Sequence, residues 1–163
     1  MTPPAPRETN ATVTAQRHRR ICDVHILLVR DEKVLLSLRK GGYAAGLWQV
    51  PSGHLEELEP TDDGAAREGL EEIGVRVPAG ELEFAHFIDH RAPGEEPRLG
   101  VFYRARSWEG EPRNAEPDKC GGLGWYRFDE IPRNTVPYHA AALAHIAQGT
   151  MRSRFGWEPA LTR

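Results

Sequence analysis

The sequence predicts a single domain of the mixed α/β class. Several runs of apolar and β-branched residues have the length of strands, and turn-forming residues separate them. Two other stretches, one before Gly74 and one after Pro137, repeat apolar residues at helical spacing. With 163 residues, the chain is long enough to bury a sizeable core.

The two ends of the chain differ in composition from the middle. Residues 1–17 are rich in proline and threonine and contain almost no large apolar side chains, which predicts a flexible N-terminal arm. The folded domain is expected over residues 18–150. Residues 151–163 contain Phe155 and Trp157, so this tail is expected to pack on the edge of the domain.

The first half of the domain predicts strands joined by short loops. Residues 21–29 and 34–38 are apolar and residues 30–33 are charged, a pattern that predicts a β-hairpin. Residues 39–43 form a basic, glycine-containing loop, which either holds substrate phosphates or is a plain surface loop. Residues 47–53 predict a short strand that runs into a glycine turn.

The second half predicts more strands and a final helix. Residues 81–90 and 99–107 have the pattern of strands, and on the first of these His86 and His90 would share a face with Phe84. That face either contacts substrate or is half-exposed. A further strand and a helix that begins at Pro137 follow. The helix has an apolar stripe made of Ala140, Ala141, Leu143, Ala144 and Ile146.

The stretch that ends at Gly74 predicts an amphipathic helix of about three turns. Residues 61–63 offer side-chain oxygens that can cap the first N–H groups, and Gly74 suits the C-terminal cap. One side of the helix carries three carboxylates, those of Glu68, Glu71 and Glu72. The opposite side, which is expected to pack on the core, carries Ala66, Gly69, Leu70 and Ile73.

The three carboxylates are placed where they repel one another and the negative end of the helix dipole. At an effective dielectric constant near 20, two carboxylates about 6 Å apart repel by roughly 3 kcal/mol. A hard divalent cation such as Mg²⁺ or Mn²⁺ would reverse that sign. The alternative is a solvated acidic face, which is the common fate of a single Glu-Glu pair.

The spacing of these residues resembles the Nudix box, the signature of hydrolases that cleave nucleoside diphosphates linked to another group. The positions that match are Gly53, Glu59, Arg67-Glu68, Glu71-Glu72 and Gly74-Val75. Gly69 departs from the aliphatic residue that is usual in the family, which predicts a thinner contact with the core. Leu58 replaces a glycine that is often seen there, so the turn at residues 56–57 is expected to differ.

The resemblance implies an α/β/α sandwich, with a mixed β-sheet between the catalytic helix and the C-terminal helix. It also implies a site for Mg²⁺, or for Mn²⁺ as a substitute. The metal ligands would be the Gly53 carbonyl, Glu68, Glu71, Glu72 and Glu116. Arg67 and Glu59 would brace the loop against the helix. Either Glu71 or Glu116 would be the general base, and the sequence leaves both open.

Outside the box, residues 114–120 are similar to a loop of nucleotide-directed Nudix members, in which a glutamate joins the metal site. Glu116 is the candidate here, and the alternative is a solvent-exposed loop acid. The candidate substrate-binding residues are Arg39, Lys40, Trp48, Tyr138 and His139. The first two would hold phosphates and the last two would shape a base pocket.

The resemblance favours hydrolysis of a nucleoside triphosphate to the monophosphate and pyrophosphate. An ADP-ribose or nucleotide-sugar pyrophosphatase is the first alternative. A non-catalytic ligand-binding module is disfavoured because the box acids are intact. A Nudix-fold isomerase would need a catalytic cysteine, and neither Cys22 nor Cys120 lies in a signature of that kind.

Composition limits the partners and the location. The formal net charge of −3 gives no electrostatic case for binding nucleic acid or membranes, so a small nucleoside diphosphate-linked molecule is the expected partner. Two cysteines without metal-ligand spacing, and no apolar run near the roughly 18 residues of a membrane span, favour the cytoplasm. A homodimer is compatible with the family, although no pattern identifies an interface.

Overall fold

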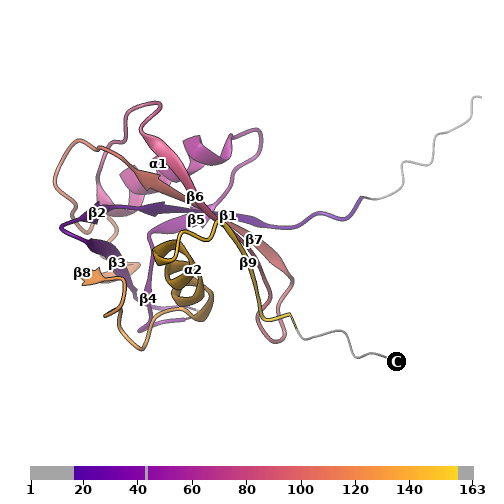
Figure 1. Cartoon of the computed structure of the whole chain (residues 1–163). Coiled ribbons are helices and arrows are strands. Elements are labelled where there is room, and N and C mark those ends of the chain that lie inside the picture. Colours follow the sequence, from indigo (N-terminus) through magenta and orange to yellow (C-terminus); the bar gives the residue numbers. More distant parts are fainter. Residues whose placement is uncertain (1–16, 43, 158–163) are drawn as a thin grey trace, which may run out of the picture.

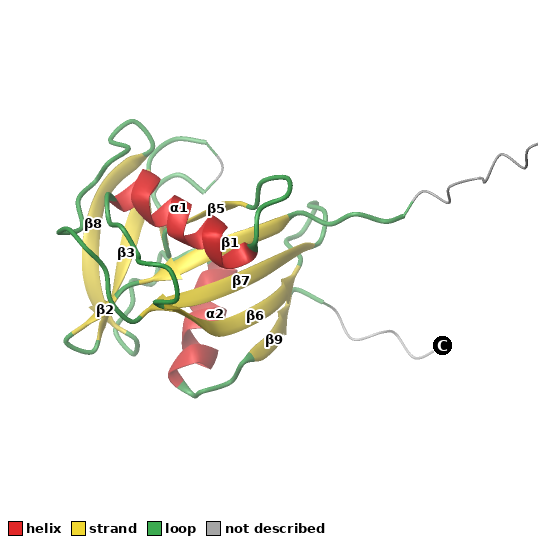
Figure 2. Cartoon of the chain, turned by 90° about the horizontal axis from the view of Figure 1, so that it is seen from above, coloured by secondary structure: helices red, strands yellow, loops and turns green. Residues whose placement is uncertain are grey.

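The computed structural model describes residues 17–42 and 44–157, which form two β-sheets and two helices. The N-terminal arm predicted at residues 1–17 lies outside the described residues, except for Arg17. Helices α1 (Thr61–Ile73) and α2 (Pro137–Ala147) lie on opposite faces of the larger sheet, as Figures 1 and 2 show. This is the α/β/α layering that the resemblance implies. None of the described helices is long and apolar enough to span a membrane.

The larger sheet has five strands in the order β5-β1-β7-β6-β9. The sheet is mixed, because β1 pairs with β7 in parallel and β6 pairs with β9 in parallel, while the other pairs are antiparallel. Its strands are β5 (Ser52–His54), β1 (Cys22–Leu27), β7 (Arg98–Ala105), β6 (Leu82–His90) and β9 (Arg152–Phe155). The tail therefore contributes an edge strand, and the Trp157 indole N–H also donates to the Asp89 carbonyl at 3.0 Å.

The smaller sheet is built around β3 (Lys33–Arg39). β8 (Cys120–Arg127) pairs with the whole length of β3, while β2 (Val29–Arg30) and β4 (Trp48–Gln49) pair with its two ends. The strands therefore divide between two sheets instead of the single sheet that was predicted, and the predicted hairpin is present but shorter, because only residues 29–30 of its first arm pair with β3. The chain leaves the larger sheet after β1, and the hairpin turns between β2 and β3. The two residues of this turn, Asp31 and Glu32, have φ angles of 51° and 61°, which the twist of a two-residue hairpin requires.

The short strand expected at residues 47–53 is also divided. β4 belongs to the smaller sheet and β5 to the larger, with the buried residues Val50 and Pro51 between them. The Ile26 N–H donates to the Pro51 carbonyl at 3.0 Å, so the crossing is tied to the middle of β1. This crossing places the end of β4 and the start of β5 side by side at the junction of the two sheets.

The core has two parts because β1 and β3 are buried on both faces. Ile26 and Leu28 pack with Ile73 on the α1 side, whereas Leu27 packs with Leu143 on the α2 side. Burying one leucine-sized side chain contributes about 1.5–3 kcal/mol, so this double burial is a large share of the stability of the domain. The two helices are therefore anchored to the same strand from opposite sides.

Helix α1 ends as predicted but begins differently. Gly74 has a φ of 68°, and N–H groups at the cap return to the carbonyls of Gly69 and Leu70. The N-cap is Pro60 and no side chain caps the first turn, so the capping prediction is wrong. The Thr61 hydroxyl is instead within 2.6 Å of the Tyr103 hydroxyl, which ties the helix start to β7.

The buried face of α1 also differs from the predicted one. Leu70 is 45% exposed, whereas Glu68 is only 8% exposed, so the helix is rotated towards its acidic side. Gly69 explains how this is possible, because a Cβ there would lie 2.9 Å from Ile26 Cδ1. The Ile26 side chain fills the place of the missing one, and the expected thinning of the core at Gly69 does not occur.

Two further side-chain predictions fail for local reasons. The register of β6 shifts between Phe84 and His86, so Phe84 is 40% exposed while His86 is fully buried and His90 is 5% exposed. The half-exposed histidine face expected for a regular strand is therefore wrong. In α2, Pro137 lies in the first turn as predicted. Of the predicted stripe, Leu143 is buried and Ile146 packs against the core, while the other buried residues of the helix are His139 and Ala142.

The first testable prediction concerns Leu58, which has a φ of 62° and is 98% exposed. A left-handed conformation costs a non-glycine residue about 1–2 kcal/mol, and this side chain has almost no contact to lose. We expect Leu58→Gly to raise the free energy of unfolding by up to about 1 kcal/mol. The gain is smaller than the relieved strain, because glycine also increases the conformational entropy of the unfolded chain. Leu58→Ala, which keeps the Cβ atom, is the control in thermal or urea unfolding. A glycine variant that is less stable than the alanine variant would contradict the strain at this turn.

Candidate active site

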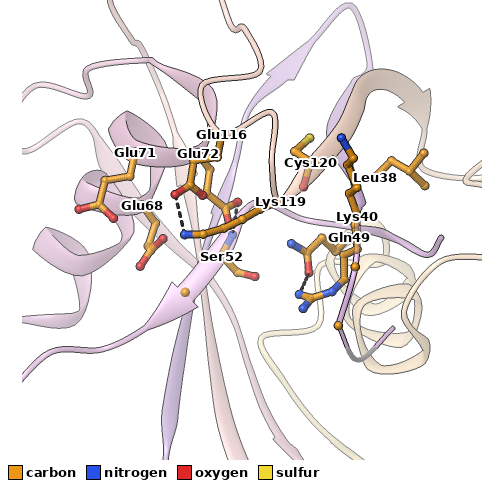
Figure 3. Close-up of a pocket in the computed structure, with 15 residues that line it drawn as sticks. Leu38, Lys40, Gln49, Ser52, Glu68, Glu71, Glu72, Glu116, Lys119 and Cys120 are labelled. Carbon is orange, nitrogen blue, oxygen red and sulfur yellow. Dashed lines mark hydrogen bonds and ion pairs between the residues drawn. The ribbon is translucent and has the colours of Figure 1, made fainter. Parts of the chain in front are cut away.

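A pocket of about 480 Å³ lies where α1 meets the junction of the two sheets. It brings together seven of the predicted site residues, Arg39, Lys40, Gly53, Glu68, Glu71, Glu72 and Glu116. We call it the acidic pocket. Figure 3 shows Glu72 and Glu116 next to each other above Ser52, while Glu71 and Glu68 lie farther to the left along α1. Residues that are more than sixty positions apart thus share one cavity.

Arg67 organises the acidic side of α1. Its Nε donates to Glu59 Oε1 at 2.8 Å and its Nη2 donates to Glu59 Oε2 at 3.0 Å, a bidentate pair that fixes the loop before the helix. Its Nη1 also donates to Glu68 Oε1 at 2.7 Å, and its Nη2 to the His54 carbonyl at 3.1 Å. Hydrogen bonds from Arg67 lower the pKa of Glu59, and those carboxylates in turn raise the pKa of Arg67. The predicted brace is present in the structure.

Gly53, the middle residue of β5, allows this strand to approach the helix. A Cβ at this position would overlap the Glu68 carboxyl group, so only glycine fits while Glu68 keeps this position. Gly64 has a related role, because a Cβ there would lie 2.9 Å from Glu59 Oε2. The backbone of residue 53 and the carboxylate of residue 68 are therefore packed directly on each other. Burial raises the pKa of Glu68, and Arg67 opposes that shift.

Glu72 is half-buried and contacts both β5 and the loop of Glu116. Its Oε2 accepts a hydrogen bond from the Ser52 N–H at 3.1 Å. Burial, together with the nearby carboxylates of Glu68 and Glu116, raises the pKa of Glu72 to about 8. A cation bound beside Glu72 would offset both the burial and the repulsion.

The loop of Glu116 is attached to the C-terminal end of α1. The N–H of Arg113 donates to the Ile73 carbonyl at 3.0 Å, and the N–H of Ala115 donates to the Glu72 carbonyl at 3.1 Å. These carbonyls have no partner within the helix, so the loop satisfies them and is positioned by them. Glu116 is consequently a lining residue of the pocket, as predicted, and its Oε1 accepts from Lys119 Nζ at 2.7 Å.

The two basic residues predicted to hold phosphates have different surroundings. Lys40 is exposed at the rim, and its Nζ donates to the Pro117 carbonyl at 3.2 Å, which clips the Glu116 loop to the end of β3. Arg39 lies deeper, and its Nη1 donates to Gln49 Oε1 at 2.8 Å. Lys119, which sequence reasoning missed, is another cation of this pocket. The sequence did contain a signal for Lys119, because it follows the loop acid Glu116 by three residues.

A second pocket of about 570 Å³ adjoins the first and shares Arg39, Gln49, Ser52 and Gly53 with it. We call it the aromatic pocket, because Tyr138, His139, His90 and Phe155 contribute to its wall. Tyr138 and His139 thus lie where the sequence predicted. Trp48, also predicted to contact substrate, lines neither pocket and packs against Tyr126 with ring centroids 5.2 Å apart.

Buried histidines support the floor of the aromatic pocket. His25 Nδ1 lies 3.2 Å from the Val101 carbonyl, so it carries the proton, and Nε2 can accept from the Tyr138 hydroxyl at 3.1 Å. His139 Nδ1 accepts from the Val50 N–H at 3.0 Å. Burial lowers the pKa of His25 to about 3 and that of His139 well below its ordinary value. Both rings are therefore neutral at physiological pH.

The aromatic pocket also contains residues that were not predicted from the sequence, including Asp23, His54 and Arg98. Asp23 was detectable in principle, because it is a charged residue inside an otherwise apolar run. Its role as a pocket residue could not be detected, since Arg98 reaches it only through the parallel pairing of β1 with β7.

Comparison with known proteins identifies the family. Residues 19–146 match the family model described as the NUDIX domain. This match covers well over half of the chain. The chain belongs to the Nudix hydrolase family. The acidic pocket is therefore built from the Nudix box, and the resemblance noted in the sequence is confirmed.

Individual relatives agree with this assignment. An oxidized purine nucleoside triphosphate hydrolase of Danio rerio is 36% identical over 112 residues, which cover 66% of each chain, just under two thirds of that relative. A MutT-like protein of Streptomyces ambofaciens is 41% identical over 123 residues, covering 76% of this chain and 74% of the relative. The crystal structure of a MutT NUDIX hydrolase from Burkholderia pseudomallei superimposes with a TM-score of 0.71 and 30% identity, covering 78% of this chain and 98% of that one.

Nudix hydrolases generally use divalent metal ions, and the groups in the acidic pocket that could bind such an ion are its carboxylates. Among the described residues, no three His, Cys, Asp or Glu side chains are arranged as a ligand set, because the box carboxylates contact Arg67, Ser52 and Lys119 instead. The chemistry nevertheless fits a hard cation. Four carboxylates line one cavity, and burial penalises the negative charge on two of them, Glu68 and Glu72.

The raised pKa of Glu72 gives a testable pH dependence for the Nudix domain without metal. The folded state keeps the Glu72 proton up to about pH 8, whereas the unfolded chain releases it near 4.5. Because the folded state binds more protons in this interval, the free energy of unfolding should fall as the pH rises from 4.5 to about 8. In a chelating buffer, Glu72→Gln should remove most of this fall.

Glu71→Gln is the matched control, because the Glu71 side chain is 52% exposed and lies on the same helix. It should leave the pH dependence of unfolding close to that of the wild type. Equal slopes of stability against pH for wild type and Glu72→Gln would contradict the burial of a proton-holding carboxyl at this position.

Proposed function

We propose that this protein hydrolyses a nucleoside triphosphate to the nucleoside monophosphate and pyrophosphate, with Mg²⁺ as the physiological ion and Mn²⁺ as a substitute. The observation that carries the proposal is the pair of joined pockets. One is lined by carboxylates and lysines, and the other by aromatic rings, with Arg39 and Gln49 between them. A nucleotide has the same two halves, a polyanionic chain and a flat base, and it would place one half in each pocket.

The residues that would hold the ion are the Gly53 carbonyl and the carboxylates of Glu68, Glu71, Glu72 and Glu116. When bound, the ion would neutralise phosphate oxygens and lower the pKa of a water molecule. The contribution of Arg67 is to keep Glu59 and Glu68 in fixed positions through three hydrogen bonds. Arg39 and Lys119 add positive charge for a phosphate chain whose charge exceeds that of the ions.

The hydrolysis itself needs a base, and two residues of the acidic pocket qualify. Glu71 or Glu116 would accept a proton from water while the water oxygen forms a bond to one of the two inner phosphorus atoms. The bridging P–O bond breaks, and its electron pair leaves with the departing phosphate group. Glu71 is the more exposed of the two, whereas Glu116 is held by Lys119 at 2.7 Å and by the end of α1.

The names of the relatives support this choice of substrate. The Danio rerio relative is an oxidized purine nucleoside triphosphate hydrolase, and a Buchnera aphidicola relative, 28% identical over 89 residues, is an 8-oxo-dGTP diphosphatase. Hydrolysis of ADP-ribose or a nucleotide sugar is the second candidate. It is favoured by one feature, namely that Pro93 and its loop line the aromatic pocket.

One experiment tests the reaction and separates the two candidates. We expect a panel of canonical and oxidised nucleoside triphosphates, assayed with Mg²⁺ and with Mn²⁺, to yield monophosphate and pyrophosphate. In ¹⁸O-labelled water the label should enter the monophosphate or the pyrophosphate, and its location identifies the phosphorus atom attacked. Label in orthophosphate with a diphosphate product would overturn the mechanism. Fast cleavage of ADP-ribose without turnover of any triphosphate would favour the second candidate.

Substitutions in the box test the roles of the carboxylates. Glu71→Gln and Glu72→Gln should each lower kcat by orders of magnitude at saturating Mg²⁺, because each removes a negative ligand. Neither should lower the stability of the metal-free protein at neutral pH, since Glu71→Gln removes one charge from a repelling cluster and Glu72→Gln replaces a carboxyl group that keeps its proton up to about pH 8. Glu57→Gln is the control, because Glu57 is exposed and lines neither pocket. Turnover near the wild-type value in both box variants would contradict the metal-ligand assignment.

A further inference from the structure

The aromatic pocket contains a buried carboxylate whose hydrogen-bonding capacity is poorly used. Asp23 is 7% exposed. Its nearest side-chain partner is Arg98, whose Nη1 is 3.4 Å from both carboxylate oxygens, and His54 Nε2 follows at 3.8 Å. Charge-assisted N–H···O bonds are normally about 2.7–2.9 Å long. The Asp23 carboxylate is therefore positioned by Arg98 without being fully satisfied by it.

A second buried group beside Asp23 has the same property. His90 is 5% exposed, and its Nε2 is buried without a hydrogen-bond partner. This nitrogen lies 3.9 Å from Asp23 Oδ2, too far for a hydrogen bond. The ring is held in place, because it stacks on Tyr138 with centroids 3.8 Å apart and planes 9° apart. Asp23, His90 and Tyr138 all line the aromatic pocket.

Burying Asp23 and His90 without full hydrogen bonding destabilises the protein. A bound ligand that supplied the hydrogen-bond partners would remove this cost. A buried donor or acceptor without a partner costs about 1–3 kcal/mol, and more when it is charged. Burial raises the pKa of Asp23, and the opposing effects of Arg98 and His54 do not fully offset it. A ligand that enters the pocket and donates hydrogen bonds to the carboxylate oxygens of Asp23 would therefore complete the site.

We propose that Asp23 is a specificity-determining residue that accepts hydrogen bonds from adjacent N–H donors on the base of the substrate, with Arg98 and His90 as positioning residues. This inference rests on the proposed function, because it takes the aromatic pocket as the place of the base. Two carboxylate oxygens match a base edge on which a ring N–H and an amino group lie side by side, as in guanine. The flat rings of Tyr138 and Phe155 in the same pocket favour a base over a ribose at this depth.

The test compares two nucleotides and two variants. GTP and ITP differ only in the amino group of the base, so the ratio of their kcat/KM values isolates that donor. We expect the wild type to prefer GTP by about ten- to a hundred-fold, the usual effect of a hydrogen bond to a charged group. Asp23→Asn should reduce this ratio to near one, because the amide presents one acceptor in place of two.

Asp89→Asn is the matched control. It makes the same chemical change on β6 next to His90, but Asp89 pairs with Arg20 at 2.9 Å and lines neither pocket. It should keep the wild-type preference for GTP. His90→Gln should lower the preference partly and mainly through KM, because His90 acts through Asp23.

Calorimetric binding of GMP and IMP to the metal-free proteins gives a readout that does not depend on turnover. A wild-type protein that hydrolyses no triphosphate but binds GMP more tightly than IMP would reject the proposed reaction and support the role of Asp23. Equal use of GTP and ITP by the wild type, or an unchanged ratio in a folded Asp23→Asn protein, would overturn the inference. A loss in Asp23→Asn that instead follows the 2′-hydroxyl, in a comparison of GTP with dGTP, would assign the carboxylate to the ribose and also overturn it.

Discussion

The structure depends on the way Arg67 neutralises the acidic face of α1. Without a cation, the carboxylates of one helix and its preceding loop would repel one another at the end of the helix where the dipole is also negative. Arg67 contacts Glu59 with two nitrogens and Glu68 with a third, so the loop and the helix share one counter-charge. Because Glu68 is held in this way, Gly53 can pack directly on it, and β5 reaches its place beside β1. The Arg67 guanidinium thus links α1 to the larger sheet.

The end of the same helix creates the rest of the acidic pocket. Helix α1 has no basic residue in its last turn, and its final carbonyls need donors. The N–H groups of Arg113 and Ala115 supply them, which brings Glu116 to a helix that ends forty residues earlier. The hydrogen bonds that satisfy the end of α1 therefore also bring Glu116 into the acidic pocket. Glu72, confined between Ser52 and Glu116, carries the cost of this arrangement as a raised pKa.

The division into two sheets gives the site its second half. The chain crosses from β4 to β5 between the sheets, and Gln49 and Ser52 flank that crossing. Both residues border both pockets, so the phosphate end and the base end of a nucleotide would meet at the sheet junction. The aromatic pocket is then closed by side chains from strands β6 and β9 of the larger sheet and from α2, which lies on the face of that sheet opposite α1.

The sequence by itself determined the features whose physics is local. Helix α1, its glycine cap, the proline in the first turn of α2 and the joint placement of Glu68, Glu71 and Glu72 follow from residue spacing, because a helix converts spacing directly into direction. The Nudix family and the lining of the acidic pocket followed from the same spacing together with the resemblance. Only the tertiary structure decided how the strands divide between two sheets, why Leu70 is exposed while Glu68 is buried, and which residues face Asp23. These depend on pairings between segments far apart in the chain, such as β1 with β7, and on a single bulge in β6 that moves Phe84 off the buried face. No periodicity within one segment encodes its partner, and for that reason the surroundings of Asp23 in the aromatic pocket could not be predicted from the sequence.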